Sequence, residues 1–296
     1  MKNNILVMMS TFNGEKYIKK QIESLLNQKD VNLKIDIRDD GSNDDTLQIL
    51  YNYSNEYDIV SYHKGSNIGY AKSFWQLVQN SDEYEYYAFC DQDDIWQDNK
   101  LARAIGLLKE QMNQDQPLLY TSRVESFNND MELISQDTFK NHKILNVYES
   151  LQKSVVPGCV FVFNNATMKY LREYNGYIES HDWIVYLIVT IFGKVIFDDE
   201  CYIKYRIHEN NTIGQVSDFK RIRGKIKNFF RPNKNTRSKV AKDIYTTYNN
   251  RLSPVFSEDI KELAYYKDDF KLKLKLIINR NFKGFIFKLY VILGKV

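Results

Sequence analysis

The sequence predicts an α/β fold whose core is a mixed, mostly parallel sheet with helices on both faces, followed by a basic helical extension. Its first 90 residues repeat an apolar segment, a polar loop and an amphipathic segment three times, before a fourth apolar segment. Alternating strands and helices of this kind build parallel sheets through right-handed crossovers. The composition is that of a folded chain, because 43% of the 296 residues are hydrophobic and only four are prolines. That length fits one large domain with a tail, or two domains.

The four expected strands all end in polar loops. These strands are Ile5–Met9, Leu33–Ile37, Ile59–His63 and Tyr86–Cys90. Apolar residues at helical spacing predict helices over Glu15–Asn27, through Leu47–Tyr53 and through Phe74–Val78. In open α/β sheets, ligands lie outside the carboxyl ends of the strands. The topology therefore predicts that four polar residues gather at one sheet edge: Thr11, Asp39, Asn67 and Asp91.

Three carboxylates follow the fourth strand without a spacer, at Asp91, Asp93 and Asp94. Their mutual repulsion raises the free energy of the folded chain unless a cation, a ligand or solvent compensates. A hard divalent ion is the natural partner for such a set, and a solvated acidic turn is the alternative. An EF-hand loop is excluded, because its glycine and glutamate positions hold Trp96 and Ala102.

The middle of the chain continues the alternation. Further helices are expected over Asn99–Met112, from a cap at Asn164 or Asn165 to Tyr174, and from His181 to Gly193, and further strands over Leu118–Ser122, Val155–Phe163, Val195–Phe197 and Tyr202–Ile207. Pro157 and Gly158 interrupt one of these strands near its start. Such an interruption marks either a place where backbone approaches a ligand closely or a structural bulge.

The charge is distributed unevenly along the chain. Residues 1–218 carry 21 Lys+Arg against 32 Asp+Glu, and residues 219–296 carry 20 against 6. This asymmetry predicts a domain over 1–218 and a basic helical region over 219–296 that meets something anionic. An anionic membrane surface, a plain solvated helical subdomain and nucleic acid are the three readings, and nucleic acid is the least favoured because no nucleic-acid-binding signature accompanies the charge.

Several classes of protein are excluded by what the sequence lacks. Cys90, Cys159 and Cys201 have neither the number nor the spacing of a disulfide framework or a zinc site, which fits a reducing cytosol. The most apolar segment, Trp183–Phe192, is about half the length needed to cross a bilayer, and no secretory signal is expected. The sequence contains no P-loop, dinucleotide-binding glycine motif, zincin motif or serine-hydrolase elbow.

Taken together, the loops resemble those of glycosyltransferase family 2, especially its bacterial members labelled rhamnosyltransferases that build polysaccharides. The segments that carry the resemblance are Ser10–Glu15, Asp39-Asp40-Gly41-Ser42, Asn67-x-Gly69 and Asp91-Gln92-Asp93-Asp94, in this order. The resemblance covers roughly residues 4–215 and implies the GT-A fold, a nucleotide-binding sheet.

The resemblance also implies roles for particular residues. It assigns nucleotide binding to Thr11, Asn13, Asp39, Asp40, Asn67, Gly69 and Asp91. It assigns a Mg²⁺ or Mn²⁺ ion on the donor diphosphate to Asp91 and Asp93, with His208 completing the metal site or hydrogen-bonding at its apex.

Asp182 stands where the family has its general base, and an N-cap of its own helix is the alternative role. His181 departs from the commoner glutamate at that position. Residues expected to border the acceptor pocket are Trp96, Gly158, His181 and Trp183.

The implied function is an inverting, metal-dependent glycosyltransferase that extends a surface polysaccharide. Rhamnose from dTDP-rhamnose is the expected sugar, with UDP-activated glucose, galactose or N-acetylated sugars as alternatives. The expected acceptor is an oligosaccharide or lipid-linked glycan at the cytoplasmic face of the membrane, where residues 219–296 would dock. A sugar-phosphate nucleotidyltransferase and a non-catalytic nucleotide-binding assembly protein are the competing functions, and the first would show a glycine-rich basic loop that Ser10–Glu15 lacks.

Overall fold

A computed structural model describes residues 2–136, 144–152, 156–208 and 235–296. The chain folds into two units, which are described separately. The first unit comprises residues 1–144, 154–173 and 180–206, and the second comprises residues 145–153, 174–179 and 207–296. The boundary expected between residues 218 and 219 lies outside the described residues, so it stays a prediction.

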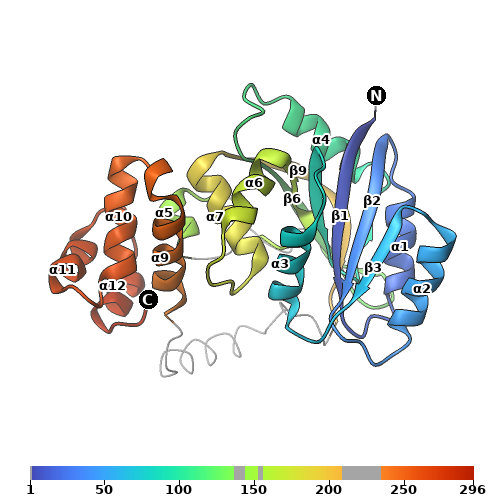
Figure 1. The fold of residues 1–296 in the computed structure, drawn as a ribbon, viewed down its shortest axis with the longest axis horizontal. Coiled ribbons are helices and arrows are strands. Elements are labelled where there is room, and N and C mark those ends of the chain that lie inside the picture. Colours follow the sequence, from blue (N-terminus) through green and yellow to red (C-terminus); the bar gives the residue numbers. More distant parts are fainter. Residues whose placement is uncertain (1, 137–143, 153–155, 209–234) are drawn as a thin grey trace. The chain divides into compact units, whose positions relative to one another are not determined.

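The first unit contains a nine-stranded sheet (Figure 1). The strands run in the order β3-β2-β1-β4-β8-β6-β9-β5, with β7 paired to β6. Their bounds are β1 Asn3–Thr11, β2 Val31–Asp39, β3 Val60–Lys64, β4 Tyr86–Cys90, β5 Ile95–Trp96, β6 Leu118–Phe127, β7 Leu133–Ser135, β8 Val162–Asn164 and β9 Lys194–Arg206. Strands β3, β2, β1 and β4 are parallel neighbours, which confirms the four predicted strands and the mixed, mostly parallel sheet.

The second half of the sheet differs in detail from the prediction. One 13-residue strand, β9, replaces the two strands expected over Val195–Phe197 and Tyr202–Ile207, because the chain between them stays paired with β6 through irregular register shifts. The strand expected over Val155–Phe163 is also wrong. A 3₁₀ turn at Gly158–Val160 precedes a strand of three residues, β8, since proline and glycine interrupt the extended backbone.

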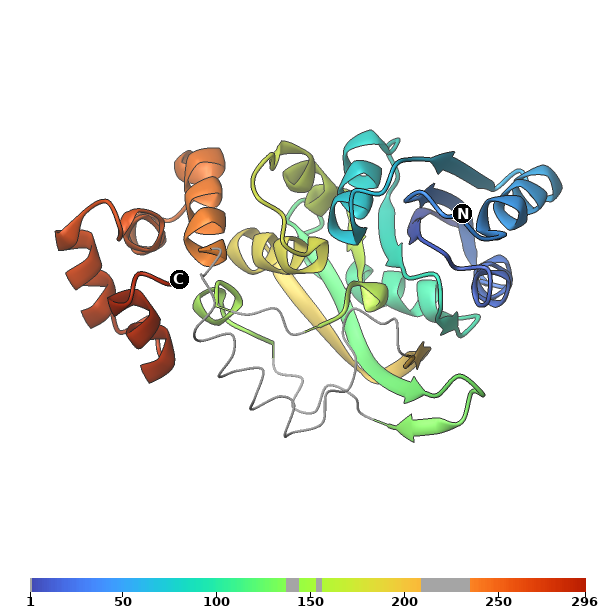
Figure 2. The same cartoon turned by 90° about the horizontal axis from the view of Figure 1, so that it is seen from below.

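Helices cover both faces of the sheet, as predicted (Figure 2). Those of the first unit are α1 Ile18–Leu26, α2 Thr46–Glu56, α3 Tyr70–Asn80, α4 Lys100–Lys109, α6 Asn165–Glu173 and α7 His181–Phe192. Helices α3, α6 and α7 pack against one another on one face, and α1, α2 and α4 lie on the other. Because both faces are covered, β4 is buried at all five positions and reads as a continuous apolar run.

The second unit is helical where it is described, in line with the expected helical C-terminal region. Its helices are α5 Val147–Ser150, α9 Thr236–Tyr248, α10 Pro254–Tyr265, α11 Phe270–Ile278 and α12 Phe285–Ile292, with a 3₁₀ turn at Asn249–Arg251. A buried carboxylate on α10, Asp259, accepts hydrogen bonds from the side chains of Tyr148, Asn279 and Asn281 and so ties α5 and the α11–α12 connection to α10. Among the described residues, no helix is long and apolar enough to cross a membrane.

Candidate active site at the carboxyl edge of the sheet

The carboxyl ends of β1 and β2 bring Thr11 and Asp39 side by side. The two residues are paired in the parallel register, and the Thr11 hydroxyl donates a hydrogen bond of 3.0 Å to Asp39 Oδ2. Both side chains are essentially buried. Asp39 Oδ1 also accepts the backbone N–H groups of Gly41 and Ser42, at 3.1 and 2.9 Å, and Oδ2 accepts the Ser42 hydroxyl at 2.5 Å. Both carboxylate oxygens of Asp39 therefore hold the loop that follows β2.

Asp40 is held in a buried ion pair. Arg38 Nη1 donates to Asp40 Oδ1 at 2.6 Å, and both side chains are less than a tenth exposed. The other bonds to Asp40 come from backbone N–H groups of the loop before α3, Ile68 at 2.9 Å and Gly69 at 2.8 Å. Arg38 further donates to the side chain of Gln76 and the carbonyl of Ser66. The pair thus joins the loops that follow β2 and β3, and it fixes the backbone around Asn67 and Gly69, both of which are exposed.

Glycines allow these loops to approach one another. Gly41 has a φ of +86°, in the left-handed region that favours glycine, and a Cβ there would lie 3.1 Å from the Asn67 backbone nitrogen. Gly69 also has a positive φ, +85°, directly before α3. The backbone therefore favours glycine at both positions, of which Gly69 is one that the family resemblance links to the nucleotide.

Gln92 ties the loop after β1 to the acidic run. Its side-chain amide accepts from the Phe12 N–H at 2.9 Å and donates to the Phe12 carbonyl at 3.1 Å. In the same loop, the Asn13 N–H donates to Ser42 Oγ and Asn13 Oδ1 accepts from the Asn43 N–H. The loops after β1, β2 and β4 therefore form one connected rim, which carries Thr11, Asn13, Asp39 and Asp91.

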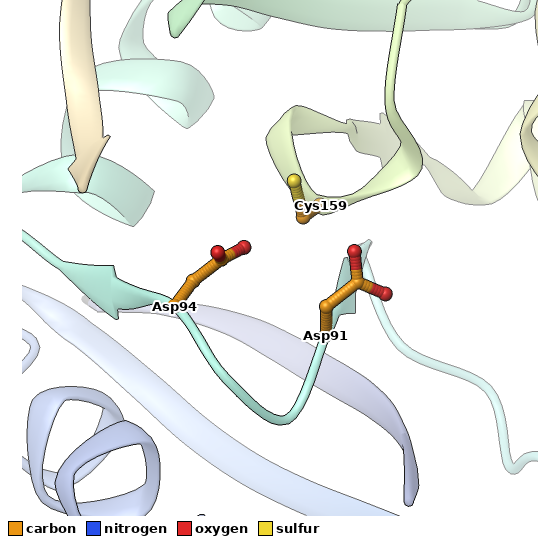
Figure 3. Close-up of side chains that lie close together, drawn as sticks. All are labelled: Asp91, Asp94 and Cys159. Atoms are coloured by element: carbon orange, nitrogen blue, oxygen red, sulfur yellow. The ribbon is translucent and has the colours of Figure 1, made fainter. Parts of the chain in front are cut away.

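The acidic run forms a cluster of converging side chains (Figure 3). Ligand atoms of Asp91, Asp94 and Cys159 all lie within 4.8 Å of one another, and the two carboxylates point toward the turn that carries Cys159. Burial raises the pKa of Asp91 to about 7, with further contributions from the negative charges of Asp93 and Asp182. Burial and the charges of Asp93 and Asp91 also raise the pKa of Asp94 well above its ordinary value. Asp91 and Asp94 are therefore costly to ionise together at this place in the fold.

A hard divalent cation fits this cluster. Asp94 Oδ1 accepts the Arg206 N–H at 3.2 Å, whereas its Oδ2 is buried without a hydrogen-bond partner among the described residues. Asp93, almost buried, holds Arg206 Nε through its backbone carbonyl. Burial raises the pKa of the Cys159 thiol well above its ordinary value, so Cys159 stays protonated and contributes little as a ligand. The carboxylates of Asp91 and Asp94 lie together here and are the groups that would hold Mg²⁺ or Mn²⁺, whose preferred ligands are oxygens. Asp93 is not among the residues whose ligand atoms lie within 4.8 Å of one another, so its part in the site stays a prediction.

Asp182 lies in the first turn of α7. The helix begins at His181 with Ser180 at the N-cap position, so Asp182 is not the N-cap that the alternative reading requires. Its Oδ1 accepts the Trp183 N–H at 2.7 Å and the Ser180 hydroxyl. Burial raises the pKa of Asp182 to about 6, while backbone N–H groups, including that of Gly158, oppose the shift. A carboxylate with this pKa is ionised at neutral pH and is well matched to general-base catalysis.

His181 points into an aromatic cluster on the sheet. Its ring stacks on Phe74 with centroids 4.0 Å apart and meets Phe89 edge-on at 4.7 Å. Burial lowers the pKa of His181 to about 3, so the imidazole is neutral. A Cβ on Gly158 would lie 2.7 Å from His181 Nε2 and 3.3 Å from Asp182 Cβ. Gly158 therefore lets the 3₁₀ turn approach α7 and press against the residues beside the expected base.

A buried lysine lies behind the cluster. Lys100 is fully buried, and its Nζ lies 3.5 Å from the centroid of the Trp96 ring. Burial lowers the pKa of Lys100 to about 7, partly offset by Cys90, Cys159 and Asp94. Trp96 is itself only 3% exposed, so its side chain shapes the wall of the cluster from within the fold.

The structure brings most of the expected residues to one edge of the first unit. His208 belongs to the second unit, and its part in a metal site stays a prediction. Trp183 is buried at the start of α7. The roles that the family resemblance implies do not include Asp94, Arg38, Gln92 or Lys100. Asp94 belongs to the acidic run for which the sequence predicts a divalent ion, whereas only the tertiary structure shows that Arg38 and Lys100 are buried beside carboxylates.

The parallel strands, the loop rim and the carboxylate cluster together define an α/β enzyme of the nucleotide-sugar transferase class. The fold agrees with that of solved structures. Chain segment 1–349 of Staphylococcus aureus TarS in complex with UDP-GlcNAc is similar with a TM-score of 0.61 at 18% identity, over 94% of this chain and 79% of that one. The mannosyltransferase PcManGT of Pyrobaculum calidifontis, in complex with GDP-Man and Mn²⁺, has a TM-score of 0.52 at 12% identity, over 99% and 75%. The fold is GT-A.

Sequence comparison identifies the family. The family model described as "Glycosyl transferase family 2" matches residues 6–172. The dTDP-rhamnosyl transferase RfbG of Shigella flexneri is 30% identical in an alignment of 232 residues that covers 72% of this chain and 75% of that protein. The putative teichuronic acid biosynthesis glycosyltransferase TuaG of Bacillus subtilis is 26% identical over 70% and 80% of the two chains. The chain belongs to glycosyltransferase family 2, as its loops predicted, and it is a glycosyltransferase.

Proposed function

We propose that this glycosyltransferase moves rhamnose from dTDP-rhamnose to a growing surface polysaccharide, with inversion at the anomeric carbon. The observation that carries the proposal is the carboxylate pair Asp91 and Asp94 after β4, whose ligand atoms lie within 4.8 Å of each other, together with Asp182 at the start of α7, whose charge contributes to the raised pKa of Asp91. The choice of donor is supported by the similarity to RfbG.

The residues divide the chemistry between them. A divalent cation held by Asp91, Asp93 and Asp94, with His208 as a further candidate ligand, would supply charge stabilisation for the departing nucleoside diphosphate. Asp182 is ionised near neutral pH and accepts the proton of the attacking hydroxyl. The bonds from Ser180 and Trp183 fix the direction of this carboxylate. A single base opposite the leaving group produces inversion.

Nucleotide binding falls to the connected rim. The proposed nucleotide-binding residues are Thr11, Asn13, Asp39, Asp40, Asn67, Gly69 and Asp91. Thr11, Asp39 and Asp40 also hold the loops through bonds within the protein, while Asn13, Asn67 and Gly69 are exposed. The second candidate donor is a UDP-sugar, because TarS, which shares the fold, was solved with UDP-GlcNAc.

The acceptor in this proposal is a lipid-linked glycan at the cytoplasmic face of the cell membrane, with residues 219–296 making peripheral contact. The basic charge of that region supports membrane contact. Residues Trp96, Gly158, His181 and Trp183 are proposed to border the acceptor pocket. The buried positions of Trp96 and His181 mean that they shape the pocket wall.

The test is thermal stability of the purified chain with Mn²⁺ and a panel of nucleotides and nucleotide sugars, because a ligand that binds only the folded state raises the melting temperature. Metal-dependent stabilisation by dTDP and dTDP-rhamnose is the expected result. Stabilisation by UDP compounds alone would replace rhamnose with a UDP-activated sugar, and no response to any nucleotide would contradict the proposal.

A further inference from the structure

The last two helices of the second unit expose large apolar side chains. Phe270, Leu274 and Ile278 of α11 recur every four residues and therefore share one face of the helix. They are 73%, 48% and 74% exposed, whereas Leu276 is fully buried. Helix α11 thus has one apolar residue packed inward and a second apolar stripe that is exposed in the described part of the chain.

The apolar side chains of helix α12 are likewise divided into buried and exposed ones. Phe287 and Val291 are buried, while Phe285 is 82% and Ile286 is 66% exposed. Ile292 and Leu293, at the end of the helix, are about half exposed. The two helices contact each other through a bond from Lys273 Nζ to the Ile292 carbonyl, at 2.9 Å. We call the exposed apolar residues of this hairpin the α11–α12 surface; its members are Phe270, Leu274, Ile278, Phe285, Ile286, Ile292 and Leu293.

The charge around the α11–α12 surface is predominantly basic, although Asp268 and Asp269 directly precede α11. Residues 270–296 contain seven basic residues and no acidic one. Lys271 and Lys275 are exposed on α11 beside the apolar stripe. Single exposed apolar residues are ordinary on protein surfaces, but a group of seven within two adjacent helices indicates an interaction site.

The charge selects among the partners that could cover this surface. A second copy of the chain would bring seven basic residues against seven more, which opposes self-association. An anionic lipid surface offers both an apolar layer for the phenylalanine, leucine and isoleucine side chains and negative headgroups for the lysines. Lysine stems can also lie along the apolar region while the ammonium groups stay in water.

We propose that the α11–α12 surface docks on an anionic lipid bilayer, with its apolar side chains inserted at the level of the headgroups and its lysines at the phosphates. Helices of nine and eight residues are far too short to span the bilayer, so they lie in its surface. The docking itself does not depend on the proposed function. The inference rests on that function only for its purpose, because a lipid-linked acceptor lies at a membrane.

The test is flotation of the purified full chain with phosphatidylcholine vesicles, with and without phosphatidylglycerol. Binding is expected to the vesicles that contain phosphatidylglycerol and to fall as salt screens the charges. The triple variant Phe270→Gln, Leu274→Gln, Ile278→Gln is expected to lower the partition coefficient at least about tenfold, because it removes the inserted apolar groups. The matched control is Val255→Gln, since Val255 on α10 is 68% exposed in the same unit and is expected to change nothing.

A second pair of variants tests the charge. Lys271→Gln with Lys275→Gln should weaken binding to phosphatidylglycerol vesicles and reduce its salt dependence, while Lys261→Gln on α10 should not. Wild-type chain that fails to float with phosphatidylglycerol vesicles, or a triple variant that floats as well as wild type, would overturn the proposal. Dimerisation that the triple variant abolishes, without vesicle binding, would also overturn it and assign the surface to self-association.

Hydrolysis of the nucleotide sugar in solution, measured on the same variants, separates this inference from the proposed function. Vesicle binding lost by the triple variant with hydrolysis unchanged supports the docking surface and leaves the catalytic proposal intact. Vesicle binding by a wild-type chain that responds to no nucleotide supports docking and contradicts the proposed function alone.

Discussion

Two groups of aspartates occupy the same edge of the sheet, and the protein treats them in opposite ways. Asp39 and Asp40 are satisfied from within: hydroxyl and backbone N–H groups saturate the first, and Arg38 pairs with the second. Asp91, Asp94 and Asp182 repel one another or lose hydration on burial, and their pKa values are raised. The comparison teaches that the first group builds the rim, whereas the second group is costly to ionise and would be stabilised by a bound cation.

The largest expected effect is on turnover, in the variant Asp182→Asn. Loss of a positioned general base lowers the rate by roughly 10²- to 10⁴-fold. The melting temperature should stay level or rise, because the variant removes a buried charge, and steady-state kinetics beside a thermal melt measures both. Near-normal turnover would show that Asp182 is not the general base. A large fall in stability would show that Asp182 stabilises the fold, as Asp39 and Asp40 do.

The variant Asp40→Ala tests the other side of the comparison. It leaves the guanidinium of Arg38 buried without its carboxylate, which should destabilise the fold by about 3–5 kcal/mol. Denaturant titration of the free energy of unfolding measures the loss. Asp94→Asn is the matched control, since it should keep stability and lose the stabilisation by Mn²⁺. If Asp40→Ala and Asp94→Asn lowered the free energy of unfolding by the same amount, the two groups of aspartates would not differ in the proposed way.

The pH dependence of stability should come from the second group. Asp91 and Asp182 have folded-state pKa values raised to about 7 and about 6, above the ordinary value near 4. Their contribution to stability is therefore fully present below about pH 4 and is lost as the pH rises through 6 to 7. Without metal, the melting temperature should fall across this interval, and Mn²⁺ should restore it at about pH 7.5 but act weakly near pH 5. A melting temperature that rises across this interval without metal would contradict the prediction.

The smallest expected effect is the loss of stability in the variant Gly158→Ala. The added Cβ would press on His181 Nε2 and Asp182 Cβ, and such overpacking costs about 1–3 kcal/mol. A double-mutant cycle with His181→Ala measures how much of the cost comes from that contact. Strict additivity of the two changes would show that Gly158 does not act through His181.

Much of the candidate site could be read from local sequence. The run Asp91-Gln92-Asp93-Asp94 directly after an apolar strand predicts a carboxylate cluster, because no spacer separates the charges. The alternation over the first 90 residues predicts the parallel half of the sheet, since such strands need both faces covered. The sequence predicted the bounds of β8 and β9 less well, because the pairing of these strands with β6 overrides local propensity.

The sequence by itself determined the order of strands and helices at the start of the chain, the family, and the basic charge of the last quarter. Only the tertiary structure decided which carboxylates are neutralised. Arg38 stands two residues before Asp40 on the chain and reaches it from the end of β2, whereas Asp182 stands far from Asp91 in sequence and near enough to raise its pKa. Charge compensation depends on distances and burial, and these are set by how the sheet and α7 pack and not by spacing along the chain.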